Sequence, residues 1–478
     1  MTFAGSRVAR VAGTRAAQGL TGREVDMSRK TLLAGAGFVL FTALPLLTPG
    51  DEVRAYPLPR VEPGPGEKGC VILEPGDNGG LSLLNPTRTS TPYTATYNLL
   101  TGTTTISSTG LLSGAGSAWL PTPDGFAGSV RLESDRLLAA IVQTYSGANA
   151  DSPGSAYPCV DPIGTTSANY PILTGGQDLV VWDMSGSGTE IDLWSYSDSG
   201  AVKGPFPKIL TPRQIRRFAA RTFGVTNSTT PGTGQVFSFN PDSFGSATVL
   251  QDGSVLPGVD AARQDNSWYL PLLPHPLVGD YRTQCSAHNA SFGPQTITRN
   301  EYDQNGNVIA TTEHTIPSWG LLQWSSLVTS AIDALATEIV GTGGTSGNCM
   351  YNGIGGGQRA AKGSGAWASL GASSLITRRG YGFGAASTQQ SKVSVMLRNV
   401  GKKKTKVKLR IFNGDTGKKV QSAAASIAAG ATAMVAYKKR ARGNNLYVEI
   451  TVKGKGTVAA WLMRNFKGDV DFYPAVPR

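Results

Sequence analysis

Charged side chains and histidines are scarce in this sequence. Asp, Glu, Lys and Arg make up 16% of its 478 residues, and three residues are histidine. Typical soluble domains carry about 25% charged residues. The signatures HExxH, GxSxG, the P-loop and GxGxxG after a strand are absent, so the common hydrolase and nucleotide sites have no match. We therefore predict that the protein is not an enzyme and uses no cofactor.

Two groups of acidic residues suggest sites, and each also fits an ordinary strand or turn. Glu133 and Asp135 lie two apart on an expected strand, whereas a glycosidase needs its two carboxylates across a cleft. Asp303, Asn305 and Gly306 resemble the start of a calcium loop, which would need further oxygen ligands and a late Glu. We expect a strand and turn at the first group, a turn at the second, and no metal site at either.

Long apolar runs are also rare, and one of them marks the N-terminal region. An apolar segment at 32–47 follows a basic stretch that begins at Met27, and small residues favour cleavage near Ala55. The segment is short for a membrane span of about 20 residues. We predict that residues 1–55 are an N-terminal extension and signal peptide. The mature chain is then secreted or attached to the cell surface, with no integral membrane span. An N-terminal membrane anchor is the alternative.

Glycine and proline are abundant, with 60 and 28 residues. Frequent turn residues favour many short strands over long helices. Apolar residues make up 40% of the chain, which is enough for a packed core. The composition therefore predicts an all-β fold.

A repeat organises most of the chain. Its anchor is an Asn or Asp at an expected strand end, where the side chain can bond neighbouring backbone groups. The four anchors recur about every 100 residues, the size of an immunoglobulin-like unit: Asn85, Asp183, Asn289 and Asn399. A turn glycine follows each anchor at a constant step, which is one position longer in the fourth copy: Gly102, Gly200, Gly306 and Gly417. A second glycine follows equally far in the first and third copies and one position nearer in the fourth: Gly116, Gly320 and Gly430.

This repeat predicts a tandem array of four antiparallel β-sandwich units of immunoglobulin-like size. The units are expected at 56–158, 159–262, 263–366 and 367–478. A β-propeller is the alternative fold. Its blades usually repeat every ~40–50 residues, so each copy would have to supply two blades.

The third unit departs from the pattern in two places. Apolar residues recur every three or four positions through 325–341, which predicts a short amphipathic helix there. A glycine-rich loop is expected from Gly341 to Trp367. His288 precedes the third anchor, and we expect it in a turn or at the surface.

Four cysteines in an exported chain suggest two disulfides, with three possible connectivities. Cys70 and Cys159 bracket the first repeat, whereas Cys285 and Cys349 fall within the third. We favour the pairs Cys70–Cys159 and Cys285–Cys349 for that reason. A zinc site is not expected, because no CxxC pair or histidine cluster accompanies these residues.

The stretches "NP" at Asn85, "YTATY", the turn at Gly102 and "GSVRLESDRLLAA" resemble tandem immunoglobulin-like β-sandwich repeats of bacterial secreted and cell-surface proteins, mostly of unknown function. The resemblance covers most of Tyr56 to Arg478. Its motifs are turn and packing residues. It implies an extracellular structural, adhesive or binding role and transfers no catalytic residues.

The fourth unit is strongly basic. From Tyr381 to Arg478 there are 19 Lys and Arg against 4 Asp and Glu. Within "TKVKLRI", cations alternate with apolar residues, which predicts a strand with a cationic outer face and an apolar inner face. Clustered cations attract polyanions. The candidate polyanion-binding residues are Lys402, Lys403, Lys404, Lys406, Lys408, Arg410, Lys418, Lys419, Lys438, Lys439, Arg440 and Arg442.

These features predict an exported structural or adhesive surface protein whose basic unit docks on an anionic envelope or matrix polymer. Surface proteins are possible further partners, and specific nucleic-acid binding is not expected after export. The competing explanation for the cations is a solubilising face that prevents edge-to-edge strand pairing. The alternative functions are a carbohydrate-binding protein with an aromatic sugar groove and, with less support, an enzyme with an unrecognised site.

Overall fold

The computed structural model describes residues 66–478, apart from 74–77, 101–102, 146–155, 162–166, 173–176, 198, 200, 224–231, 241–242, 250–254, 261–264, 273–280, 290, 292, 329–333, 354–363, 369, 385–390, 439–444 and 467–468. The described residues belong to one compact unit, Leu58–Arg478. The predicted signal peptide lies outside the described residues, as do Lys439, Arg440 and Arg442.

The described chain is built from strands, with short 3-10 helices. Repeat 1 contains β1 (Lys68–Ile72), β2 (Asn78–Leu84), β3 (Thr91–Leu99), β4 (Thr104–Leu112), β5 (Ser117–Pro121), β6 (Gly128–Ser134), β7 (Ala139–Tyr145) and β8 (Ala156–Pro158). Repeat 2 contains β9 (Ser167–Ile172), β10 (Asp178–Asp183), β11 (Thr189–Ser197), β12 (Val202–Leu210), β13 (Ile215–Ala219), η1 (Ala220–Phe223), β14 (Gly232–Ser238), β15 (Phe244–Val249), β16 (Val255–Pro257) and β17 (Val259–Asp260).

The second half continues in the same way. Repeat 3 contains β18 (Asp265–Pro271), β19 (Tyr281–Asn289), β20 (Gln295–Asp303), β21 (Val308–Ile316), β22 (Leu321–Val328), β23 (Ala334–Gly353), β24 (Ser364–Ala368), β25 (Leu370–Gly371) and η3 (Ala372–Ser374). Repeat 4 contains β26 (Arg379–Phe383), β27 (Ser391–Asn399), β28 (Thr405–Asn413), β29 (Lys419–Ile427), β30 (Thr432–Ala436), β31 (Leu446–Lys453), β32 (Val458–Phe466), β33 (Asp469–Pro474) and β34 (Val476–Pro477).

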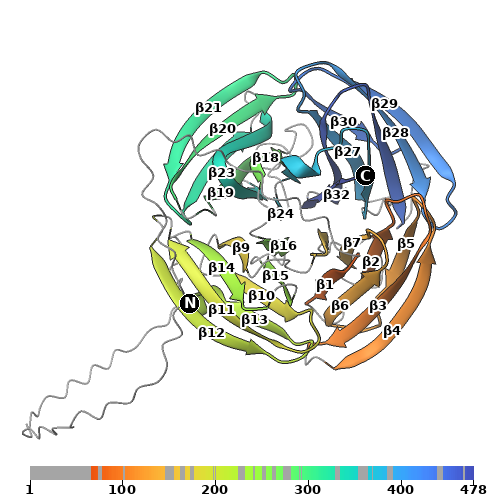
Figure 1. The fold of residues 1–478 in the computed structure, drawn as a ribbon. Helices are drawn as coiled ribbons and strands as arrows, with labels where there is room; N and C mark the ends of the chain where they lie inside the picture. Colours follow the sequence, from red (N-terminus) through yellow and green to blue (C-terminus); the bar gives the residue numbers. More distant parts are fainter. Residues whose placement is uncertain are drawn as a thin grey trace, which may run out of the picture. The chain divides into compact units, whose positions relative to one another are not determined.

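Repeats 1, 2 and 4 each form two antiparallel sheets with an interleaved strand order, and the described strands of repeat 3 form one eight-stranded sheet. Repeat 1 has the orders β4-β3-β6-β1 and β5-β2-β7-β8, and repeat 4 has β29-β28-β31-β26-β34 and β30-β27-β32-β33. Some consecutive strands, such as β3 and β4, pair side by side, but others, such as β2 and β3 or β5 and β6, lie in different sheets. A propeller blade built as a meander keeps all its consecutive strands side by side. The prediction of an all-β fold with antiparallel sheets is confirmed, and the sheets are consistent with an array of sandwich units (Figure 1).

The anchor side chains explain why the repeat is visible in the sequence. Asn399 Nδ2 donates to the carbonyls of Lys403, Ile427 and Ala428 at 2.8, 3.0 and 2.9 Å. Asn85 and Asn289 make the same three kinds of bond, to the equivalent carbonyls of the next turn and of a later turn. The three Asn anchors are fully buried. One amide thus ties a strand end to the turn that follows it and to a later turn.

That later turn repeats a backbone conformation as well. Ala115, Arg213 and Trp319 have φ of 55, 60 and 60°, and Gly430 has φ of 71°. Each of these residues lies equally far after the turn glycine of its own copy. The equivalents of Gly430 are therefore Ala115 and Trp319, not the neighbouring Gly116 and Gly320. Gly116 and Gly320 lie one position after the residues that correspond to Gly430 in the structure.

The helix predicted within 325–341 is wrong for the described part of that segment. Residues 325–328 end β22, and residues 334–341 begin the long strand β23. Part of the expected glycine-rich loop is also strand, because β23 continues to Gly353 and β24 covers 364–368. The reason is pairing: β23 lies between β20 and β18 in its first half and between β19 and β24 in its second.

Cores are shared between neighbouring repeats. Val130 of repeat 1 and Val180 of repeat 2 belong to one cluster, and Ile297 of repeat 3 shares a cluster with Met396 of repeat 4. Repeats 2 and 3 meet where the Thr233 hydroxyl donates to the Trp319 carbonyl at 2.9 Å. Each repeat is therefore held partly by the next one.

The last repeat also contacts the first. Ile141 of repeat 1 lies in the core of repeat 4, and the Ser117 hydroxyl donates to Asn445 Oδ1 at 2.7 Å. Four corresponding strands contact one another in sequence, β8 with β16, β16 with β24, β24 with β33, and β33 with β8. Figure 1 shows the orange strands of repeat 1 next to the blue strands of repeat 4. The array prediction did not include this contact between its two ends.

The cysteine pairing is confirmed in repeat 1, where Cys70 and Cys159 form a disulfide. In repeat 3, Cys285 is disulfide-bonded and lies opposite Cys349 in the register of β19 and β23. The side chain of Cys349 lies outside the described residues, so the pair Cys285–Cys349 stays a prediction.

Candidate functional site

The basic stretch of repeat 4 forms strand β28. Thr405, Val407, Leu409 and Ile411 are buried in it, whereas the residues between them face outward. The alternation arises because successive side chains of a strand point to opposite faces. Exposed cations on or near this strand are Lys402, Lys403, Lys404, Lys406, Lys408, Lys418, Lys419 and Lys438, and Arg410 is half-buried.

The surroundings of Lys406 and Lys408 concentrate positive charge. Lys406 lies directly opposite Lys453 of β31, which is not among the residues predicted from the sequence. On the other side, Lys406 and Lys408 lie opposite Ser426 and Ala424 of the edge strand β29. Within the described part of the chain, none of the three lysines has an acidic partner. Like charges directly opposite one another destabilise a sheet, so this pair costs the fold some stability.

Arg410 differs from these lysines. Its Nη2 donates to both oxygens of Glu449 at 2.7 and 2.9 Å. Arg379 Nε reaches the same carboxylate at 3.1 Å. Two guanidinium groups therefore neutralise Glu449. The basic face consists of Lys406, Lys408 and Lys453, with Arg410 committed to an internal ion pair.

Further lysines extend the basic face at one end of the strand. Lys402, Lys403 and Lys404 occupy the turn between Asn399 and β28. The turn after Lys453 lies beside it, because Val400 N donates to the Thr457 carbonyl at 3.1 Å. This turn contributes the exposed Lys455. The anchor amide thus holds the backbone that presents these cations, since it bonds the Lys403 carbonyl.

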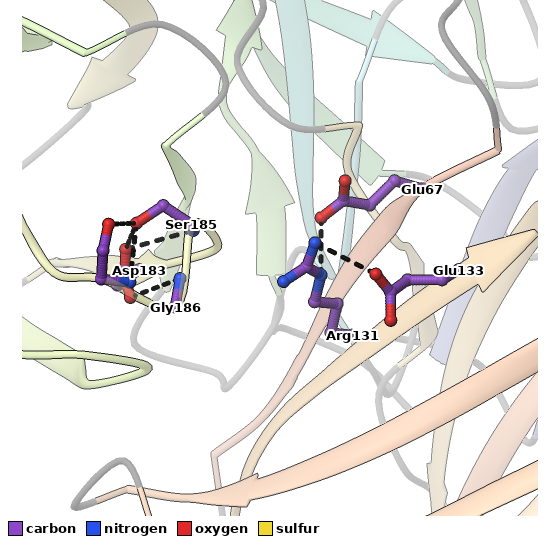
Figure 2. A network of polar contacts seen from close by, with 7 residues as sticks. Glu67, Arg131, Glu133, Asp183, Ser185 and Gly186 are labelled. Carbon is purple, nitrogen blue, oxygen red and sulfur yellow. Dashed lines mark hydrogen bonds and ion pairs between the residues drawn. The ribbon is translucent and has the colours of Figure 1, made fainter.

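A second feature is a cavity between repeats 1 and 2, of about 100 Å³. Arg131 lies on one wall, with Nε 2.8 Å from Glu67 and Nη2 3.1 Å from Glu133 (Figure 2). Glu133 thus pairs with arginine, and Asp135 lies in the exposed turn that follows β6. The two acids considered as a catalytic pair do not face each other across a cleft.

Asp183 forms the opposite wall of the cavity, and Figure 2 shows it with Ser185 and Gly186. Its carboxylate accepts bonds from the backbone N–H groups of Ser185, Gly186, Gly188 and Arg213, at 3.2, 3.0, 3.3 and 2.6 Å. A carboxylate has no hydrogen to donate to carbonyls as Asn does. The turns of repeat 2 therefore present N–H groups where the other copies present carbonyls.

The remaining candidates have structural roles. Asp303 accepts bonds from the backbone of Asn305 and Asn307 at 2.8 Å each, which is turn chemistry, as predicted. No group of three or more His, Cys, Asp or Glu among the described residues could hold a metal ion. His288 is buried in β19, so its expected place in a turn or at the surface is wrong.

The described tryptophans lie mostly in the core. Trp182, Trp268, Trp324 and Trp461 are buried. Trp319 is partly buried and stacks on Tyr196 of repeat 2, with ring centroids 5.4 Å apart. These rings serve packing within and between repeats.

Comparisons with known proteins leave the family open. No family model matches the chain, and no curated protein does. A solved tetra-tandem repeat from the extending region of a large adhesion protein is similar at 9% identity, over 87% of this chain and 100% of its own, with a TM-score of 0.11. A likeness at that level carries no argument. Within the described residues, no helix has the length and hydropathy needed to cross a membrane.

Proposed function

We propose that the protein is an exported, non-enzymatic structural or adhesive protein that docks on an anionic polymer of the cell envelope or matrix. The docking surface is the basic face of Lys406, Lys408 and Lys453, extended by the lysines of the two adjoining turns. Export rests on the N-terminal sequence, and docking rests on the sheet of repeat 4.

One observation carries the proposal. Lys406 and Lys408 follow one another on the outward side of β28, and Lys453 lies opposite Lys406. Alternate residues of a strand are about 6.7 Å apart, so the row presents charges at a regular spacing to an extended chain. Small neighbours on β29 leave the row uncovered. Two facing lysines repel each other and cost the fold some stability. A role in binding a polyanion would explain why both are present.

A solubilising role is the competing explanation, since edge lysines also block strand pairing. The two explanations differ in where the positive charges must lie. Solubility depends on charge anywhere on the surface, whereas docking depends on these lysines together. Arg88, Arg136 and Arg221 provide a matched control, because they are exposed and lie outside the basic face.

The test compares the full chain with two triple variants on immobilised polygalacturonate and on immobilised polyphosphate. We expect retention of the wild type at low salt and release as salt screens the charges. Lys406→Ser, Lys408→Ser and Lys453→Ser together should weaken retention at least tenfold. The control with Arg88→Ser, Arg136→Ser and Arg221→Ser should change it little. Equal loss in both variants would show that net charge alone is responsible.

A further inference from the structure

The four junctions between repeats share one position that an aromatic ring usually occupies. It lies equally far after each anchor and carries Tyr196, Tyr302 and Phe412 in repeats 2, 3 and 4. Tyr196 stacks on Trp319 of the next repeat. Arg398 of repeat 4 lies over the Tyr302 ring, with its guanidinium carbon 4.0 Å from the centroid. Phe412 packs against the core that repeat 4 shares with repeat 1.

Repeat 1 has Asn98 at this position. Asn98 is 4% exposed and lines the cavity of about 100 Å³ between repeats 1 and 2. An amide is smaller than a phenyl or phenol ring, so space remains where the other junctions are filled. Gly69 on the same wall lets Trp182 approach closely, because a Cβ there would come within 2.7 Å of Trp182 Nε1 and of Met184 Sδ.

The cavity offers hydrogen-bond donors and acceptors close together. Its polar wall from repeat 1 consists of Thr96, Asn98, Ser129, Arg131 and Glu133, and the wall from repeat 2 includes Trp182, Asp183 and Arg213. Arg131 and Asp183 are held in place by their own bonds, so the groups are preorganised. Trp182 is 2% exposed, and its Nε1 has no acceptor among the described residues. A buried indole N–H usually has a partner, and Trp182 lines the cavity, so its N–H can donate to an acceptor bound there.

We propose that this cavity binds a neutral polyhydroxylated molecule the size of one sugar ring or smaller. Arginines and carboxylates face each other across it, so neither sign of charge dominates. An anion would meet Glu133 and Asp183, and a cation would meet Arg131. A hydroxyl group donates and accepts at once, which suits alternating donors and acceptors. A volume of about 100 Å³ suits a small polyol or a single sugar ring.

The proposal goes beyond docking on a polyanion and involves none of the lysines of the basic face. The full chain is titrated with glycerol, D-xylose and D-glucose, and with D-glucuronate as the charged counterpart. Binding is followed by calorimetry and by tryptophan fluorescence. We expect saturable binding of at least one neutral probe and weaker binding of D-glucuronate.

Two variants locate the site. Asn98→Tyr installs the residue of repeats 2 and 3 and should weaken binding more than tenfold by filling the cavity. Trp182→Phe keeps a ring and removes the N–H, so it should weaken binding several-fold. The triple lysine variant should bind the neutral probes normally, which separates this site from polymer docking.

Thermal unfolding of each variant shows whether it folds. If Asn98→Tyr does not fold, Trp182→Phe provides the binding test. Undiminished binding by the folded variants would overturn the proposal. Tighter binding of D-glucuronate than of the neutral probes would overturn the assigned ligand class. No saturable binding of any probe would overturn both.

Discussion

Strand β3 of repeat 1 and strand β28 of repeat 4 occupy the same place in their repeats. Each follows an Asn anchor that binds three carbonyls, and each lies between an edge strand and a central strand. Their inward residues are buried in both. Their outward residues differ: Pro92 and Thr94 in repeat 1, Lys406 and Lys408 in repeat 4. The anchors and inward residues build the repeat, so the outward face is free to carry function.

The anchor gives the largest expected effect. Asn399→Asp places in repeat 4 the residue that repeat 2 uses, but it faces three carbonyls instead of N–H groups. A buried charge without compensation costs about 3–5 kcal/mol. We expect the free energy of unfolding in denaturant to fall by that amount. Asn305→Asp, in an exposed turn, is the control, and its free energy of unfolding should fall by much less. Equal losses would mean that the anchor amide is not what joins the turns.

A pH-dependent effect, which is small near neutral pH and grows as the pH falls, comes from the residue before the third anchor. Burial lowers the pKa of His288 to about 3. The unfolded chain, with a pKa near 6.5, then binds more protons between those values, so stability falls as pH drops from about 6.5 to 3. His288→Leu copies Leu84, which precedes the first anchor, and should flatten this part of the stability curve. His314→Leu, at an exposed position of β21, should leave the slope in place.

The smallest effect concerns the turn shared by all four copies. The described residues other than glycine with positive φ are Ala115, Arg213 and Trp319, and all occupy this turn. Ala115→Gly removes the strain of a left-handed alanine and should raise the unfolding midpoint by an amount equivalent to about 1 kcal/mol or less. Gly417 has φ of 64°, and a Cβ there would meet open space. Gly417→Ala should therefore lower the unfolding midpoint. A loss of stability in Ala115→Gly would show that the alanine methyl contributes more by packing than it costs.

The sequence alone predicted what depends on local pattern. The alternation in β28 follows from strand geometry, and each Asn anchor bonds a turn only four residues on, so both are visible in the local sequence. The helix expected at 325–341 failed because the first half of β23 pairs with β18 and β20, which lie more than 30 residues earlier in the sequence. His288 was misplaced for a similar reason: it is buried on β19, which lies between β22 and β23, and the Trp319 ring is 6.5 Å away. The basic face was visible, but its pairing with Lys453 required the register of β28 and β31.

The cavity could not be predicted from the sequence, although one residue that lines it differs in kind from its equivalents in the other repeats. Asn98 occupies the position that carries Tyr, Tyr and Phe in the other three repeats. That difference becomes meaningful only when the position is known to lie between repeats. The contact of repeat 4 with repeat 1 left no comparable trace, since it joins residues from opposite ends of the described chain, such as Ser117 and Asn445.

The salt dependence of polymer binding tests the docking proposal most directly. Affinity for polygalacturonate is measured over a range of salt for the wild type and for the triple variant at Lys406, Lys408 and Lys453. Each cation that releases a counterion contributes about 0.7–0.9 to the slope of log K against log salt in nucleic acids. We predict that the slope becomes shallower by about two to three in the variant, while its unfolding midpoint does not fall. An unchanged slope and affinity would contradict docking through the basic face of repeat 4.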